Sequence, residues 1–483
     1  MSFIVVGITI NAFRIVIFTF SSANGFVSVE YCTIFCNFVL VNQRYREILA
    51  LAVPSIVSNI TVPLLGLADL MVVGHIGNEN YIGAIAVGSM IFNIIYWVLG
   101  FLRMGTSGMT SQAYGAEAWD EALRILVRAL VIGLGMGLLF IVAQRPIEWA
   151  MLRAMSTPAS SVSLVQSYFR IAIWGAPAML GLYGLTGWFI GMQNTKVPML
   201  TAIMQNIVNI GASLFFVFVL RWRIEGVAMG TLIAQWAGFL MAVAVLCRGL
   251  GRQYFFEGRA AISWTLLRST LTYLEAWKRF FVVNRDIFLR TLCLVAVNLF
   301  FTSAGGRQGA MMLAVNTLLM TMFTLFSYFM DGFAYAGEAL SGKLYGANDG
   351  QGLRKMVRSL FVIGLWTVAV FTLVYAVGGL DFLRLLTDEE RVVLASRPYL
   401  IWVCLIPVSG VAAFIFDGIF IGLTETKGML VSSAVAMVCF FVFYFLAWPY
   451  MGNNALWIAF LMFLGIRGLL QFVWFRKRGV WKL

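Results

Sequence analysis

The sequence has few charged residues, a single histidine and no cysteine pair with the spacing of a metal or redox site. Asp, Glu, Lys and Arg make up 11% of its 483 residues, against about a quarter in a typical soluble domain. Hydrophobic residues make up 61%, and the mean hydropathy is +0.90. The lack of charge argues against a soluble domain and predicts a protein that crosses a membrane many times.

Several kinds of site are excluded by residues that the sequence lacks. One histidine, His75, cannot form a multi-histidine metal site, and the six cysteines show no CxxC spacing, so we expect no metal and no cofactor. There is no P-loop, which leaves a gradient of H⁺ or Na⁺ as the energy source for any transport. The net charge of +13 comes from basic residues between apolar runs, so it indicates membrane topology and no nucleic-acid partner.

Apolar runs of about 20 residues, the length that crosses a bilayer as a helix, recur along the chain. They are apolar on every face, as in Val131–Ala143, whereas barrel strands alternate with polar positions. The predicted fold is therefore an all-α polytopic membrane protein. Hydropathy places about 12 helices at residues 48–75, 82–113, 125–143, 161–191, 197–220, 226–247, 287–304, 310–340, 355–379, 393–423, 428–450 and 454–475.

Short words in the first half of the chain return in the second half at a fixed distance. QAYGAE at 112–117 corresponds to KLYGAN at 343–348, and WFIGMQNTK at 188–196 to IFIGLTETK at 419–427; both pairs are 231 residues apart. Six helices per half give repeats of the same orientation, related by a pseudo-two-fold axis along the membrane normal. We expect an N-lobe at 44–247, a linker at 248–286, a C-lobe at 287–475 and a basic tail at 476–483.

Most Lys and Arg residues fall in loops on one side of the predicted bundle, which the positive-inside rule assigns to the cytoplasm. Both ends of the bundle and the linker would then be cytoplasmic. Residues 1–43 form an extension of uncertain status outside the repeat. Its apolar stretch Phe3–Phe20 is a signal-like segment, an extra helix or, as we favour, upstream sequence included by a wrongly chosen start.

Asp69 is the strongest candidate for a functional residue. It lies in an otherwise apolar span, where a charge costs about 2.5–3.5 kcal/mol on insertion scales, and such carboxylates often relay protons or ions. The alternative is a carboxylate near the helix end that is simply solvated. Pro54 and Pro63 lie in the same span, and each predicts a kink because proline removes a backbone hydrogen bond.

The fifth and sixth spans carry uncharged polar residues at helical spacing. Such a stripe either lines a cavity or bonds neighbouring helices; with Asp69 in the same half, we favour a shared polar pocket. Its expected members are Asn206, Asn209, Ser213, Thr231 and Gln235.

The C-lobe has its own intramembrane charges, Arg290, Asp331, Glu338 and Asp417. They form either structural pairs or a second ion or substrate site. Asp331 and Glu338 are seven residues apart and share a helix face. For Arg103 we favour a structural role.

The sequence contains the words LADLMVVGHIG, FLRMGTSGMTSQAYGA, FAYAGEALSGKLYGA and FDGIFIGLTETK. Together they resemble the multidrug and toxic compound extrusion (MATE) family, in its DinF-like branch. The resemblance covers about residues 44–476. It implies two six-helix lobes in a bacterial inner membrane and export of amphiphilic, often cationic compounds in exchange for H⁺ or Na⁺. We expect a monomer.

The resemblance also implies roles for particular residues. Asp69 matches the carboxylate that is held to bind the coupling proton, with Asn209 and Thr231 as polar partners. Ser213 departs from the pattern, since some members have a second Asp there. Arg290 stands where NorM-like members have a Glu associated with sodium, whereas Asp417 matches a NorM-like carboxylate.

These observations predict a secondary antiporter, with H⁺ favoured over Na⁺ as the coupling ion, in which protonation of Asp69 and substrate occupancy compete. One alternative is a flippase for lipid-linked precursors, which would need a strongly cationic cavity to hold phosphates. Another is an intramembrane enzyme, which would need convergent acid, base or metal ligands.

Overall fold

The computed structural model describes the backbone of residues 4–9, 14–19, 43–74, 79–154, 159–251 and 264–477. It describes the side chains of residues 43–61, 81, 83–153, 161–249 and 268–477. Contacts divide the chain into two units, Met1–Ala50 and Leu51–Leu483.

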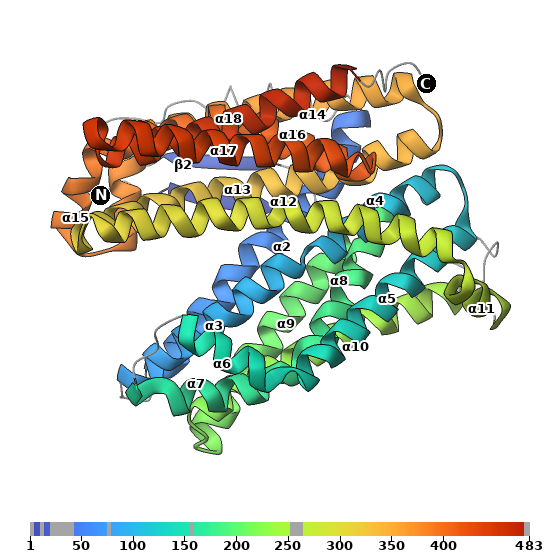
Figure 1. The fold of residues 1–483 in the computed structure, drawn as a ribbon, viewed down its shortest axis with the longest axis horizontal. Coiled ribbons are helices and arrows are strands. Elements are labelled where there is room, and N and C mark those ends of the chain that lie inside the picture. Colours follow the sequence, from blue (N-terminus) through green and yellow to red (C-terminus); the bar gives the residue numbers. More distant parts are fainter. Residues whose placement is uncertain are drawn as a thin grey trace. The chain divides into compact units, whose positions relative to one another are not determined.

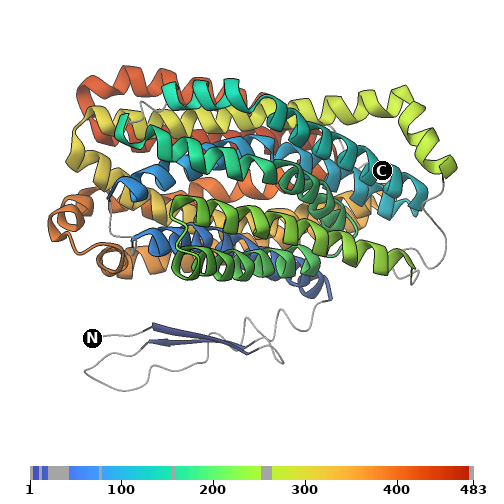
Figure 2. The same cartoon turned by 90° about the horizontal axis from the view of Figure 1, so that it is seen from below.

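The first unit contains a β-hairpin and the start of helix α2. Strands β1 (Ile4–Thr9) and β2 (Arg14–Thr19) pair antiparallel, with Ile4 opposite Thr19 (Figure 2). Both strands are rich in Ile and Val, whose branched side chains favour extended backbone. An extra helix in this stretch is therefore wrong for the described residues.

The second unit is helical in all its described elements (Figure 1). The helices are α2 (Gln43–Gly74, which begins in the first unit), α3 (Glu79–Leu99), α4 (Phe101–Gly115), α5 (Trp119–Val142), α6 (Gln144–Ala154), α7 (Ala159–Ala172), α8 (Ala176–Gly191), α9 (Lys196–Leu214), α10 (Ile224–Gly251), α11 (Trp264–Thr272), α12 (Leu274–Arg307), α13 (Ala310–Gly346), α14 (Gly350–Leu386), α15 (Glu390–Ser396), α16 (Leu400–Gly422), α17 (Thr426–Met451) and α18 (Asn453–Lys477).

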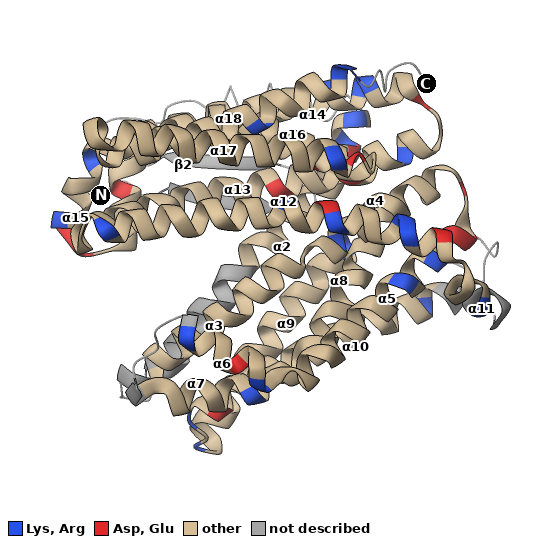
Figure 3. Ribbon diagram, in the orientation of Figure 1, with Lys and Arg blue, Asp and Glu red and all other residues tan. Residues whose placement is uncertain are grey.

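The predicted polytopic fold is confirmed. Among the searched residues, 11 stretches are long and apolar enough to cross a membrane, with α3–α4, α7–α8 and α15–α16 each forming one stretch. Helix α2 covers the remaining predicted span at 48–75. Uncharged residues make up most of each helix, as the tan colour in Figure 3 shows.

Several helices are longer than hydropathy predicted. α12 begins at Leu274, inside the expected linker, and α13 and α14 continue to Gly346 and Leu386. The added turns carry charged residues such as Lys278 and Lys343, which lower hydropathy without ending a helix. Hydropathy therefore located the apolar core of each span and missed its polar ends.

The repeat is present in the backbone as well as in the sequence. α3 and α13 begin 231 residues apart, as do α5 and α14, while α8 and α16 end 231 residues apart. Residues with positive φ recur at the same distance: Glu117 and Asn348 (53° and 55°), Gln193 and Thr424 (61° and 54°), and Arg221 and Gly452 (57° and 53°). A left-handed residue is uncommon outside glycine, so three matched pairs indicate two copies of one fold.

The two lobes meet along α4 of the first and α13 of the second, with α12 and α16 also touching α4. The contact is close because glycines face backbone: a Cβ at Gly115 would collide with the carbonyl of Lys343, and one at Gly346 with the carbonyl of Gln112. Gln112 donates to the Gly422 carbonyl at 2.8 Å, and Gln193 donates to the Ala339 carbonyl at 2.8 Å. The repeated words thus bond one lobe to the other.

Candidate functional site

Helix α2 carries Asp69 together with Pro54 and Pro63, and its helical backbone continues through both prolines. The side chains of Asp69 and Pro63 lie outside the described residues. Near Pro54, the Ser55 hydroxyl donates to the Leu51 carbonyl at 2.9 Å. The expected kink and the surroundings of Asp69 remain predictions.

Two residues of the expected polar pocket are bonded to each other. Asn209 on α9 donates from Nδ2 to Oγ1 of Thr231 on α10 at 3.1 Å, and Thr231 donates to the Val227 carbonyl at 3.1 Å. Asn209 and Ser213 are fully buried, on one face of α9. The Asn209 Oδ1 and the Ser213 Oγ have no hydrogen-bond partner in the described part of the chain. Buried polar atoms are seldom left unpaired, so these two atoms could bond a further polar or titratable group.

The other two members of the stripe lie elsewhere. Asn206 donates to the carbonyl of Thr61 on α2 at 2.9 Å, which ties α9 to the helix that carries Asp69. Gln235 points its Oε1 at Gly175, where a Cβ would collide with it. The structure therefore brings together Asn209, Ser213 and Thr231, while Asn206 and Gln235 bond or pack beside them.

The C-lobe charges form a buried cluster around Asp417 on α16. Arg290 on α12 bonds Oδ2 of Asp417, Gln471 on α18 donates to Oδ1 at 2.6 Å, and Arg467 on α18 lies 3.7 Å from Oδ2. All four side chains are nearly inaccessible to solvent. Two guanidinium groups and an amide therefore surround one carboxylate, which leaves it little need of a further cation.

A separate ionic contact, outside the Asp417 cluster, joins the two lobes. Nη1 of Arg103 on α4 lies 3.6 Å from Oε2 of Glu338 on α13, and its guanidinium sits 4.2 Å from the ring centre of Tyr335. Asp331, on the same face of α13, interacts electrostatically with Arg103, Arg290 and Arg467. Of these two carboxylates, Glu338 is the one whose ion pair with Arg103 lies within 4.0 Å in the described residues.

Sequence reasoning missed Arg467 and Gln471. The signal was present, because an Arg in the last apolar span is as unexpected as an Asp in the first. Their partner, Asp417, is distant in the sequence, so only the packing of α16 against α18 reveals the cluster.

The polar sites of the two lobes do not match. The repeat positions of Asn209, Ser213 and Asp69 are Phe440, Tyr444 and Phe300 in the C-lobe. There, ring centres lie 5.9 Å apart for Phe300 and Phe440, and 5.0 Å for Phe300 and Tyr444. One scaffold therefore carries a polar pocket in the first lobe and an aromatic cluster at the same place in the second.

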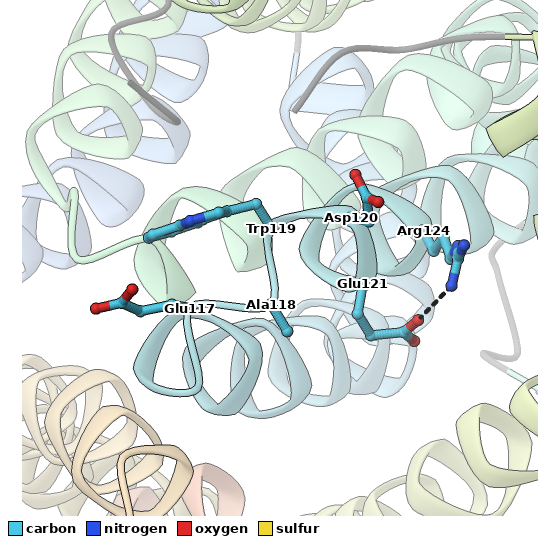
Figure 4. A pocket seen from close by; sticks show the side chains of 6 residues that line it. All are labelled: Glu117, Ala118, Trp119, Asp120, Glu121 and Arg124. Atoms are coloured by element: carbon cyan, nitrogen blue, oxygen red, sulfur yellow. Dashed lines mark ion pairs between the residues drawn. The ribbon is translucent and has the colours of Figure 1, made fainter. Parts of the chain in front are cut away.

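One surface pocket, of about 370 Å³, opens at the turn between α4 and α5 (Figure 4). Its lining is largely acidic, and Arg124 pairs with Glu121 at 3.7 Å. None of the predicted site residues lines it. In the described residues no three His, Cys, Asp or Glu side chains are grouped so as to hold a metal ion.

Comparisons with known proteins agree on one family. The family model MatE matches residues 54–215 and 287–446. DNA damage-inducible protein F of Escherichia coli (strain K12) is 35% identical over 461 residues, covering 94% of this chain and 98% of its own. Probable multidrug resistance protein NorM of Bradyrhizobium diazoefficiens is 24% identical and covers 86% and 90%.

Solved structures show the same fold. The crystal structure of MATE in complex with MaL6 aligns with a TM-score of 0.79 at 20% identity, covering 92% of this chain and 99% of that one. MATE in the bent conformation aligns with a TM-score of 0.77 at 20% identity, covering 91% and 96%.

Proposed function

Because this chain belongs to the MatE family of membrane transporters, we propose that it exports amphiphilic, often cationic organic compounds in exchange for protons. Family membership excludes the intramembrane enzyme, since members are transporters. Two similar proteins bear the name multidrug resistance protein NorM, which supports a broad range of small substrates. We propose that it works as a monomer.

Asp69 is the proposed proton site, and repeat symmetry supports it. Its counterpart Phe300 contacts Phe440 and Tyr444, which are the counterparts of Asn209 and Ser213. An equivalent arrangement in the first lobe would place the Asp69 carboxyl beside the two buried atoms that lack a partner, Asn209 Oδ1 and Ser213 Oγ. A protonated carboxyl can donate to such an acceptor and an ionised one cannot, so the proton changes the bonding of the pocket.

The proposed cycle follows from this change. A proton that enters from outside neutralises Asp69, which then bonds Asn209 and no longer attracts a cationic substrate in the same pocket. The substrate leaves outward. Loss of the proton to the cytoplasm restores the charge and with it the affinity for the next cation.

Protons are favoured over sodium because of the Asp417 cluster. A sodium ion at Asp417 would have to compete with Arg290 and Arg467, which already compensate its charge. Two observations carry the proposal: Asn209 Oδ1 and Ser213 Oγ lack a described partner in the first lobe, and Arg290 and Arg467 compensate the charge of Asp417 in the second.

The flippase alternative needs a cationic cavity for phosphates. The buried arginines of the described residues, Arg103, Arg128, Arg290 and Arg467, each lie within 4.0 Å of a carboxylate, which removes most of their attraction for an anion. Charge balance therefore favours the exporter of cations.

We place the protein in the bacterial inner membrane, with both ends of the helical bundle in the cytoplasm, from the positions of its basic loops. The repeated words that bond the lobes adjoin such loops, at Lys343 and Lys427, so the contact lies at the cytoplasmic side. On this assignment the structure is closed towards the cytoplasm.

The test is uptake of tetraphenylphosphonium, a hydrophobic cation, by proteoliposomes with pH and Na⁺ gradients imposed separately. We expect the pH gradient to drive transport by the wild type. The Asp69→Asn variant should insert normally into the membrane and show no proton-driven transport. Full proton-driven transport by Asp69→Asn refutes the assignment, and transport driven only by Na⁺ refutes proton coupling.

A further inference from the structure

The contact between the lobes contains an ion pair that the proposed exchange at Asp69 does not use. The Glu338 side chain is 1% exposed and that of Arg103 10%, and their 3.6 Å separation is too long for a hydrogen bond. The Glu338 Oε1 and the Arg103 Nη1 both lack a hydrogen-bond partner among the described residues. Two buried charged groups thus lie close together while some of their polar atoms have no hydrogen bond. In such a place, a bound proton or a small movement changes the energy of the contact strongly.

One member of the pair, Glu338, has its repeat counterpart on the facing helix α4. Ser107 on α4 and Glu338 on α13 are repeat positions, 231 residues apart. One turn further along α4, Ser111 donates to the backbone carbonyl of Glu338 at 3.4 Å. The first lobe has a hydroxyl where the second has a carboxyl, so a titratable group stands at the point where the two copies meet.

Arg103 forms an ion pair with Glu338, and the charge of Asp331, on the same face of α13, also acts on it. A single guanidinium cannot fully compensate both in a poorly hydrated place. When Glu338 holds a proton, Arg103 is left with Asp331 alone. When Glu338 is ionised, its attraction for Arg103 joins α13 of one lobe to α4 of the other.

The charged and titratable groups around this site come from several helices. They are Arg103 on α4, Tyr183 on α8, Arg290 on α12, Asp331 and Tyr335 on α13, Asp417 on α16 and Arg467 on α18. Of the carboxylates, Asp417 is enclosed by Arg290, Arg467 and Gln471, whereas Glu338 forms its ion pair with Arg103.

We propose that Glu338 is a second proton-binding group, whose ionised form holds α4 and α13 together through Arg103 and whose protonation lets the lobes separate at this contact. The inference rests on the proposed proton-driven export. A proton bound from outside would loosen the cytoplasmic contact and so permit opening inward. Release of that proton to the cytoplasm would restore the pair and close the contact again.

The contact can be followed by the distance between Ala116 and Ala347, repeat positions that are both exposed in the loops after α4 and α13. Spin labels carried by noncanonical amino acids avoid the six native cysteines. The distance distribution is measured in nanodiscs over a pH series. In the wild type we expect longer distances to gain population as the pH falls.

Glu338→Gln mimics the protonated form, so we expect its long-distance population at high pH to exceed that of the wild type about tenfold and to respond little to pH. Glu338→Asp and Arg103→Lys keep the charges and should keep the pH response, which separates a lost proton site from a misfolded contact. Asp69→Asn should also keep it.

A wild-type pH response in Glu338→Gln overturns the inference, as does a wild-type distance distribution that ignores pH. Neither result depends on Asp69. Conversely, proton-driven transport by Asp69→Asn removes the proposed coupling site while leaving the distance measurement to decide on Glu338.

Discussion

At the scale of single residues, the buried charged and polar groups inside the membrane differ between the two lobes. Asp417 is surrounded by Arg290, Arg467 and Gln471, and we interpret its role in the C-lobe as structural. Asn209 and Ser213 present polar atoms that lack a described partner. Intramembrane carboxylates could be recognised from the sequence because charge is so scarce there, but their partners could not, because Arg467 and Gln471 come from a distant helix.

The Asp417 cluster predicts a large loss of stability on neutralisation. Asp417→Asn leaves two buried guanidinium groups without a counter-charge, which costs about 3–5 kcal/mol of the free energy of unfolding. Thermal unfolding in detergent measures the effect. Asp381→Asn, in an exposed pair with Arg384 at 3.2 Å, is the control and should change the midpoint little. Equal midpoints for the two variants would show that the cluster contributes no stability.

The first-lobe pocket predicts a loss of transport with little loss of stability. Asn209→Leu removes the donor to Thr231 and the unpaired Oδ1, so we expect proton-driven uptake of tetraphenylphosphonium to fall about tenfold, the effect of some 1.4 kcal/mol. Asn298→Leu is the matched control, because the Asn298 side chain bonds only the Leu294 carbonyl of its own helix in the described contacts. Similar losses in both variants would contradict a special role for Asn209.

At the scale of helices, the repeat was predictable and the helix ends were not. Two pairs of sequence words indicated a shift of 231, and the starts of α5 and α14 and the ends of α8 and α16 obey it. The start of α12 at Leu274 was missed because charged residues extend a helix past the apolar stretch that hydropathy detects. The hairpin of β1 and β2 was also missed, since its residues are as apolar as those of a span.

Close helix packing between the lobes predicts that one methyl group disturbs it. Gly115→Ala places a Cβ against the backbone of Lys343, so we expect the Ala116–Ala347 distance to shift towards longer values at every pH. Gly135→Ala, in α5, has nothing within 4 Å of the added carbon and raises helix propensity equally. A wild-type distance distribution in Gly115→Ala would show that the contact between the lobes accommodates the added methyl group.

At the scale of the whole molecule, two copies of one helical fold carry different chemistry at corresponding places. Phe300, Phe440 and Tyr444 form an aromatic cluster where the first lobe has Asp69, Asn209 and Ser213 in sequence. The polytopic fold and the family were predictable from composition and repeated words. The pairing of charges across helices was not, because it depends on tertiary packing. The role of Asp69 stays a prediction, because its side chain lies outside the described residues.

The central claim is that a proton and a cationic substrate exclude each other at Asp69. The most direct measurement is proton release from the purified protein, in weakly buffered detergent solution, when tetraphenylphosphonium is added. The account predicts about one proton released per cation bound by the wild type, and binding without release by Asp69→Asn. Equal proton release by both proteins, or binding to the wild type with no release, would contradict it.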